Sequence, residues 1–121
     1  MAIFNIGKDF SDHPIGRFYS DGNSSGEEFR EEYLLPRVLK LADSEKLAII
    51  IDEEVDGYGS SFLVEGFAGI VKYGYMTGDE LLAKIEIHFS DDDFKFFKDK
   101  IESYIKNAKF DSKTYQSTKG T

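Results

Sequence analysis

The segment Lys46 to Asp52 (KLAIIID) constrains the fold of this chain more than any other stretch of its 121 residues. It is short, almost continuously apolar and rich in isoleucine, and it is followed by the acidic residues Glu53 and Glu54. An apolar run of this length is typical of a central strand that is covered on both faces. When helices connect such a strand to its neighbours, the sheet is parallel, so the flanking segments decide the fold class.

The segment before this strand predicts a helix. Ser25 and Glu28 form a capping box, which marks the start of the helix. Pro36 lies inside the pattern and lacks a backbone N–H, so we expect a kink or a break near Leu35. The apolar positions share one face of the helix: Phe29, Tyr33, Leu34, Val38 and Leu41.

A second helix is predicted after the strand, from about Ser60 to Tyr73. Gly66 and Gly69 are costly inside a helix unless the backbone must approach another element closely. We expect that element to be the sheet. Gly74 is expected to end the helix.

The last third of the chain predicts one more strand and one more helix. In Lys84 to Phe89 (KIEIHF), apolar and polar residues alternate, as in a strand with one buried face. Ser90 and Asp93 form another capping box. The apolar stripe of the last helix contains Phe94, Phe97, Ile101, Tyr104, Ile105 and Ala108.

The first twenty residues predict a hairpin of two short strands, over residues 3–7 and 15–20, with a turn at Asp12-His13-Pro14. The expected order is therefore β-β-α-β-α-β-α, an α/β domain with a mixed central sheet of about four strands and helices mainly on one face. This single domain covers residues 1–110. Residues 111–121 are a polar C-terminal tail, which we expect to be frayed.

Composition excludes several classes of function. Fifteen Lys and Arg against 23 Asp and Glu give a formal net charge of −8, which repels phosphate backbones and anionic lipids, so neither nucleic acid nor a membrane is an expected partner. The absence of cysteine excludes disulfides and a cysteine nucleophile. No apolar run approaches the ~20 residues of a membrane helix, and the first residues lack a signal-peptide pattern, so we expect a cytoplasmic protein.

Ser60 and Ser61, at the start of the second helix, are the first candidate site. A hydroxyl there lies near free backbone N–H groups and the positive end of the helix dipole, so a phosphate on it is favourable locally. Asp52 and Asp56 in the preceding turn repel such a phosphate. Simple helix capping is the competing interpretation, because serine is a preferred N-cap residue.

The loop Asp21 to Gly26 is the second candidate site. Ser24, Ser25 and Gly26 precede a helix and offer N–H groups to an anion, and Arg17 and Arg30 flank the loop. The loop lacks the lysine of a phosphate-binding P-loop. The competing interpretation is a capped loop whose two arginines form ordinary salt bridges.

No metal or cofactor site is predicted. The acidic turn Asp52 to Asp56 suits a solvated loop better than a Mg²⁺ site, and Asp91 to Asp93 suits helix capping. His13 and His88 are the only histidines, and neither has a companion at metal-ligand spacing.

The segment Ile50 to Tyr73 (IIDEEVDGYGSSFLVEGFAGIVKY) resembles the strand, acidic turn, serine pair and helix of STAS domains, the anti-sigma-factor antagonists and their relatives. An upstream set is similar to the bacterial STAS-like family of unknown function; it comprises Pro14-Ile15-Gly16-Arg17-Phe18, Asp21-Gly22, Ser25-Gly26-Glu27, Phe29-Arg30 and Leu34-Leu35-Pro36. The resemblance covers about residues 10–108. It implies a STAS-like fold and a partner that is an ATP-binding kinase-like protein or an anti-sigma-type regulator.

The same resemblance implies a role for the serine pair. In the antagonists the first serine of the pair is phosphorylated by a partner kinase, and that serine matches Ser60, with Ser61 as its neighbour. The chain departs from the pattern at two positions, because Gly59 replaces the preceding aspartate and Phe62 replaces the following glycine.

We therefore expect a non-enzymatic interaction module of bacterial signalling, switched by phosphorylation of Ser60 or Ser61. Its docking surface is predicted around Asp56, Tyr58, Gly59 and Phe62, because tyrosine is enriched at interfaces. One alternative is a small enzyme or binding domain that holds an anionic small molecule with Arg17, Arg30 and the Asp21–Gly26 loop. Another is a scaffold whose only function is self-association.

Overall fold

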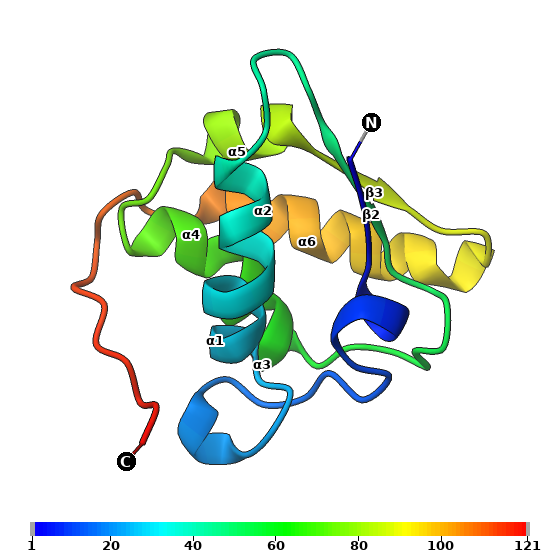
Figure 1. Ribbon diagram of the computed structural model, residues 1–121, viewed down its shortest axis with the longest axis horizontal. Coiled ribbons are helices and arrows are strands. Elements are labelled where there is room, and N and C mark those ends of the chain that lie inside the picture. The colour runs from blue at the N-terminus through cyan, green and yellow to red at the C-terminus, as the bar shows by residue number, and fades with distance from the viewer. Residues whose placement is uncertain (1, 121) are drawn as a thin grey trace.

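The computed structural model describes residues 2–120 and places three parallel strands side by side in a single sheet. The strands follow their order in the chain, β1-β2-β3, with β2 in the centre (Figure 1). Phe4 of the first strand pairs with Ile49 of the second, which pairs with Ile87 of the third. Their bounds are β1 (Ala2–Asn5), β2 (Leu47–Ile50) and β3 (Ile85–His88).

Helices connect the strands; the two long ones each contain a π-helical stretch, and the short η1 is itself π-helical. Between β1 and β2 one helix runs through α1 (Gly26–Glu28), the π-helical η3 (Phe29–Leu34) and α2 (Leu35–Leu39). After β2 a second helix runs through α3 (Ser60–Leu63), the π-helical η4 (Val64–Ala68) and α4 (Gly69–Lys72). The remaining elements are η1 (Ile6–Phe10), η2 (Tyr19–Asp21), α5 (Gly78–Lys84), η5 (Asp92–Phe94) and α6 (Lys95–Asn107).

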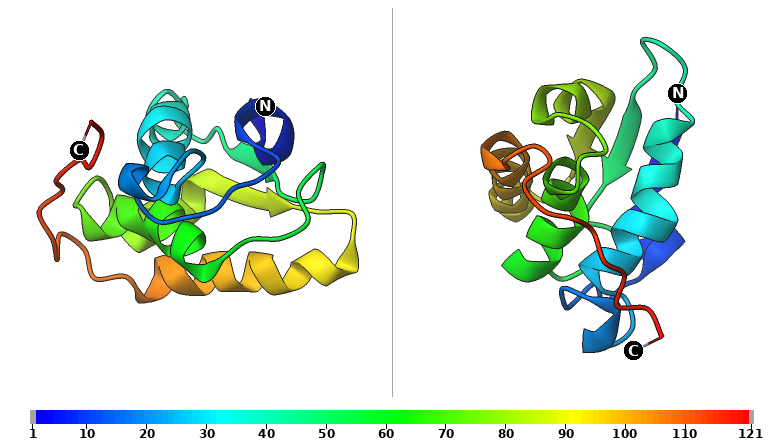
Figure 2. Two further views of the ribbon diagram at one scale, coloured as in Figure 1. Left: turned by 90° about the horizontal axis from the view of Figure 1, so that it is seen from below. Right: turned by 90° about the vertical axis from the view of Figure 1, so that its left-hand side faces the viewer.

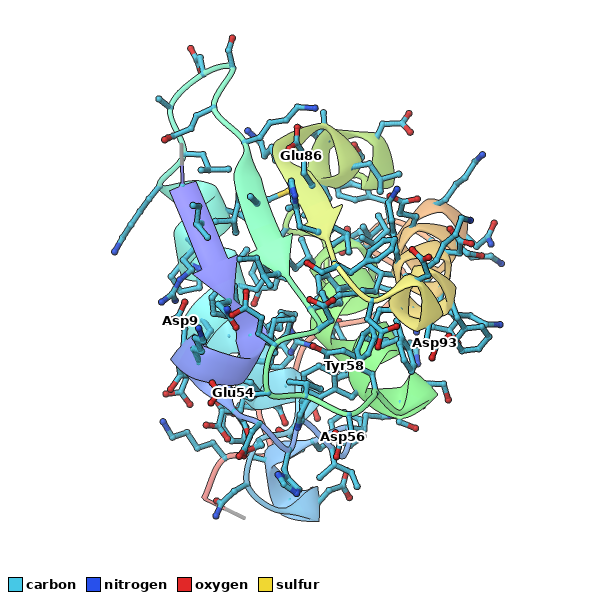
Figure 3. All side chains as sticks on the ribbon, turned by 90° about the vertical axis from the view of Figure 1, so that its right-hand side faces the viewer. Asp9, Glu54, Asp56, Tyr58, Glu86 and Asp93 are labelled. Atoms are coloured by element: carbon cyan, nitrogen blue, oxygen red, sulfur yellow. The ribbon has the colours of Figure 1, made fainter. Side chains whose placement is uncertain are left out.

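All of these connecting helices cover the same face of the sheet (Figure 2). Phe4, Ile49 and Ile87 point toward the helices and are buried in the core. Figure 3 looks onto the other face, which no helix covers, and there Ile3 is 61% exposed. On that face of β2, however, Ala48 is buried and Ile50 is half-buried. The central strand is therefore largely buried on both faces, although helices cover only one of them, and helices on one face agree with the expected arrangement. Successive right-handed crossovers in one direction along a sheet put every helix on one side.

The expected mixed sheet of about four strands is wrong. Residues 15–20 form a loop and the start of η2 instead of a strand, because the Asp21 carboxylate accepts hydrogen bonds from the backbone N–H groups of Arg17 (3.1 Å) and Phe18 (2.9 Å). Because these N–H groups are bonded to Asp21, they are not available to pair with a neighbouring strand. The α/β class remains, with a purely parallel sheet.

Two details of the helix boundaries differ from the expectations. Helix α5 was not predicted, although Thr77 and Glu80 form a capping box at its start. At the start of η5 the capping side chain is Asp91, which accepts from the Asp93 N–H at 3.0 Å, instead of Ser90.

Pro36 does not break its helix. The π-helical η3 directly precedes it, and the Leu35 N–H bonds to the carbonyl of Arg30, five residues back. A π-type turn changes which carbonyls accept the backbone hydrogen bonds. The helix therefore continues past Pro36 although proline has no N–H to donate.

The first two helices cross with their backbones in close contact. A Cβ atom on Gly26 would lie 2.6 Å from the Phe62 carbonyl oxygen, and a Cβ on Gly66 would lie 2.8 Å from the Phe29 ring. A Cβ on Gly69 would lie 2.5 Å from an Arg30 nitrogen. These glycines are therefore required by the neighbouring helix, and the expectation that the sheet requires Gly66 and Gly69 is wrong.

The C-terminal tail lies against the body of the domain and is not frayed. The backbone N–H groups of Asp111 and Lys113 bond to the carbonyls of Val71 and Lys72, each at 3.1 Å. The described part of the tail, up to residue 120 and red in Figures 1 and 2, passes α4 and reaches η2, where the Ser20 N–H bonds to the Thr118 hydroxyl.

Candidate functional site

The serine pair begins the second helix, at the carboxyl-terminal edge of the sheet. Ser60 is the first helical residue and is exposed, and Ser61 is half-buried. The N-cap residue is Gly59, which has no side chain to accept hydrogen bonds from the first N–H groups of the helix. Serine capping of this helix, the competing interpretation of the pair, is therefore wrong, because the serines follow the cap position.

Tyr58 is fixed beside the serine pair. Its hydroxyl donates to the Ile51 carbonyl at 2.7 Å, and its ring centroid lies 5.9 Å from that of Phe62 and 5.5 Å from that of Phe97. Burial, together with the nearby charge of Asp52, raises the pKa of the Tyr58 hydroxyl far above its usual value. Tyr58 is therefore a rigid, neutral aromatic group, which suits a contact anchor better than an acid–base group.

Two shallow hollows meet at Tyr58. The first, about 220 Å³, is lined by Asp12, His13, Pro14, Ile15 and Asp56 to Gly59. The second, about 230 Å³, is lined by Tyr58, Ser60, Leu63, Phe96, Phe97, Lys100 and Tyr104. Figure 3 shows Tyr58 and Asp56 beyond the carboxyl ends of the strands, the edge at which open α/β sheets bind their ligands.

Phe62 does not lie on this surface, contrary to the prediction that it contacts a partner. Its side chain is fully buried, and its ring packs on Phe29 with centroids 5.2 Å apart. Phe62 supports Tyr58 from the core. The exposed aromatic side chain is Phe96, which is 59% exposed on α6 and was not predicted.

The structure joins one arginine of the second candidate site to the serine pair. A terminal nitrogen of Arg17 donates to the Ser61 hydroxyl oxygen at 3.3 Å. A cation thus lies next to the start of the helix, close to where a phosphate on Ser61 would be.

The Asp21–Gly26 loop is not an open anion cradle. The Ser25 hydroxyl accepts the Glu28 N–H at 3.1 Å, so the predicted capping of the helix by Ser25 is confirmed. The Ser24 N–H donates to the Glu28 carboxylate at 3.0 Å, and Gly26 is packed against the Phe62 carbonyl. These groups are already used within the protein.

Arg30 is fully buried and lies apart from Arg17. Its guanidinium donates to the Glu65 carboxylate (2.8 Å), the Glu65 carbonyl (2.7 Å) and Glu31 (2.7 Å). The rings of Tyr73 and Tyr115 lie over it at 4.7 and 4.9 Å. Burial alone lowers the pKa of Arg30, but the two carboxylates outweigh it and raise the pKa, so the charge is retained.

This buried cluster of Arg30, Glu65 and Tyr73 was missed because two of its members lie in a segment that was assigned only as an apolar helix. The signal was Glu65, a charge inside the apolar stretch Phe62 to Val71. A charge in a buried stretch requires a partner. The contacts of Arg30 contradict its predicted role in binding an anion from solution.

The acidic turn has structural partners. Asp52 accepts hydrogen bonds from the backbone N–H groups of Ser90 and Asp91, and Glu53 pairs with Lys8 at 2.8 Å. Among residues 2–120, no three His, Asp or Glu side chains are grouped so as to hold a metal ion. Within the same residues, no helix has the length and hydropathy needed to cross a membrane.

Comparison with known proteins gives no relative. No protein-family profile, curated protein sequence or solved structure matches the chain.

Proposed function

We propose that this protein is a non-enzymatic interaction module of bacterial regulation, which binds a protein partner through the surface around Tyr58 and Ser60. We call this the docking surface and define it by Asp56, Tyr58, Gly59, Ser60 and Phe96. The proposal rests mainly on one observation: an exposed serine begins a helix and lines one of two hollows that share a rigid tyrosine.

The geometry of the docking surface suits a switch by phosphorylation. A phosphate on Ser60 adds a charge of about −2 next to the first N–H groups of the helix. Lys100 lines the same hollow, and Asp56 is exposed on the other side of Tyr58. The phosphate places a charge at the entrance of the apolar hollow. An apolar side chain of the partner then binds there less favourably, so the partner's affinity falls.

Ser61 is the second candidate for modification. Its hydroxyl already accepts a hydrogen bond from Arg17 and is half-buried. A phosphate on Ser61 pairs with Arg17, which stabilises the modified helix start but does not obstruct the hollow as directly. Ser60 is therefore the preferred site of the switch.

The class of partner follows from the STAS resemblance. In the antagonists, the partner kinase phosphorylates such a serine. The expected partner is therefore an ATP-binding kinase-like protein or an anti-sigma-type regulator. The alternative, an anion-binding domain or enzyme that uses Arg30, is disfavoured by the complete burial of Arg30.

The test is a comparison of tagged variants purified from the native host. Wild type, Ser60→Asp and Phe96→Ser are compared with Ile3→Ser, which changes an exposed apolar side chain on the helix-free face of the sheet. We expect one ATP-binding protein to copurify with wild type and Ile3→Ser, and to be reduced about tenfold with the two docking-surface variants, because an added charge or a lost apolar contact weakens a small interface.

An equal yield of that protein from all four variants would place its binding site elsewhere and contradict the proposal. Ser60→Ala is the matched control for charge. It removes the hydroxyl without adding charge, so it is expected to keep the partner but to carry no phosphate at position 60.

A further inference from the structure

The C-terminal tail occupies a polar site on the side of the molecule away from the helix-free sheet face. We call this site the tail seat and define it by Tyr19, Glu27, Arg30 and Tyr73. Glu27 and Arg30 lie one helical turn apart at the start of the first helix, and both are fully buried. In Figure 2 the tail crosses the ends of the helices to reach this region.

Two tail residues make most of the polar contacts. The Tyr115 hydroxyl donates to the Glu27 carboxylate at 2.7 Å. The Thr118 hydroxyl and backbone N–H donate to the two oxygens of the same carboxylate, at 2.7 and 3.0 Å. The Tyr115 ring also packs at a tilt against Tyr73, with centroids 5.2 Å apart and an interplanar angle of 55°, and it covers Arg30. The tail is therefore held on Glu27 through an aromatic hydroxyl and a threonine three residues later.

The seat is held in place by the body of the domain. The Tyr19 N–H donates to Glu27 at 3.0 Å, and Arg30 is fixed by Glu31 and Glu65. None of these bonds involves the tail. When the tail leaves, the Glu27 carboxylate loses three donors and the Arg30 guanidinium loses one of its two aromatic covers. One Arg30 nitrogen, Nη2, is buried without a hydrogen-bond partner among the described residues. An empty seat thus keeps its geometry and favours a replacement of the same chemistry.

The tail is joined to the body by a segment that can act as a hinge. Residues 109–114 are all exposed and form no helix or strand, and among the described residues their backbone hydrogen bonds to the body are those from Asp111 to Val71 and from Lys113 to Lys72. Asp111 has a left-handed backbone conformation with φ 53°, which is uncommon outside glycine. Exposed connectors with few packed side chains open more easily than the core.

We propose that the tail seat is a peptide-binding site, which the chain's own tail fills within one molecule and which the tail of a second copy fills between two molecules. Every copy carries both the seat and the one segment that is seen to fit it. Reciprocal exchange of identical tails makes the same contacts twice and closes a two-fold dimer. This inference does not depend on the proposed docking surface, which uses other residues.

The first experiment vacates the seat in the full-length chain. Tyr115→Ala with Thr118→Ala removes the tail's hydroxyl contacts and leaves Glu27 and Arg30 unchanged. A fluorescent synthetic peptide of residues 111–120 (DSKTYQSTKG) is then titrated, and its fluorescence anisotropy is measured. We expect it to bind the double variant at least tenfold more tightly than wild type, whose own tail competes. A peptide carrying the same two alanines is the matched control and should not bind.

The second experiment tests exchange between copies. The double variant has an intact seat and a defective tail; Glu27→Gln has a defective seat and an intact tail. We expect a 1:1 mixture to form a heterodimer in sedimentation velocity, while each variant alone remains monomeric. Circular dichroism confirms that both variants are folded.

Failure of the peptide to bind the folded double variant would overturn the binding site. Peptide binding without a heterodimer would overturn the second copy as its occupant. Neither result bears on Ser60 or Tyr58, so failure here is distinguishable from failure of the proposed function.

Discussion

Arg30 is an arginine without contact to solvent. Its side chain is fully buried between two helices, where it meets Glu65, Glu31 and the rings of two tyrosines. A buried charge loses its hydration, and only paired charges and complete hydrogen bonding compensate for that loss.

Replacing Arg30 therefore leaves Glu65 as an uncompensated buried charge. We expect Arg30→Ala to lower the free energy of unfolding by about 3–5 kcal/mol, measured by urea denaturation. Lys95→Ala, which removes an exposed pair with Asp99, is the control and should cost less than about 1 kcal/mol. A loss below 1 kcal/mol for Arg30→Ala would contradict the buried network.

Gly26 shows the same dependence of one helix on the other. A Cβ at this position meets the Phe62 carbonyl oxygen at 2.6 Å, and backbone atoms cannot rotate away as a side chain does. We expect Gly26→Ala to cost about 1–3 kcal/mol in thermal or chemical unfolding, since the helices must separate. Gly59→Ala, with no atom within 4 Å of the added Cβ, should cost less than about 1 kcal/mol. Equal losses would mean that the helices do not touch at Gly26.

At the scale of elements, α5 depends on its capping box. The Thr77 hydroxyl accepts the Glu80 N–H at 3.2 Å, and the Glu80 carboxylate accepts the Thr77 N–H at 3.0 Å. Thr77→Ala is expected to lower the free energy of unfolding by about 1 kcal/mol, measured by urea denaturation. Thr114→Ala changes an exposed tail position and is expected to have little effect. If the two variants lose the same stability, the box does not hold the start of α5.

Elements with a local cause were predictable. The strand at β2 follows from its isoleucines, and the start of the first helix follows from Ser25 and Glu28. The missing hairpin strand was not predictable in the same way. Whether this segment forms a strand depends on Asp21. The Asp21 side chain accepts hydrogen bonds from the backbone N–H groups of Arg17 and Phe18 and so competes with strand pairing.

In the candidate site, too, features with a local cause were predictable and features set by distant contacts were not. The exposed serine at the start of a helix follows from local sequence, whereas the burial of Arg30 and Phe62 is set by a helix crossing that joins distant segments. Gly26, Gly66 and Gly69 carry the signal of that crossing, but a single sequence does not say which element each glycine meets.

In the whole molecule, Glu27 joins the N-terminal part of the chain to the C-terminal tail, because its carboxylate accepts hydrogen bonds from Tyr19, Tyr115 and Thr118. Burial alone raises the pKa of its carboxyl, but hydrogen bonds from Thr118, Tyr19 and Tyr115 outweigh burial and lower the pKa below its usual value. A carboxyl with a depressed pKa in the folded state stabilises the protein above its unfolded pKa of about 4.3. That contribution is lost as the pH falls through the folded pKa.

We therefore expect the melting temperature of wild type to exceed that of Glu27→Gln at pH 7, and the difference to shrink as the pH falls below about 4. The measurement is thermal unfolding by circular dichroism between pH 7 and pH 3. Glu102→Gln, which weakens a surface pair with Lys98, is the control and should show little difference at any pH. A gap between wild type and Glu27→Gln that stays constant with pH would contradict the assignment.

The proposed switch is phosphorylation of Ser60 on the docking surface. The most direct measurement is mass spectrometry of the protein purified from its native host, read for phosphate on the peptide that contains Ser60 and Ser61 and for a copurifying ATP-binding protein. We expect phosphate on Ser60, and a partner that binds only the unmodified chain. An unmodified serine pair in every growth condition, with no partner retained, would contradict it.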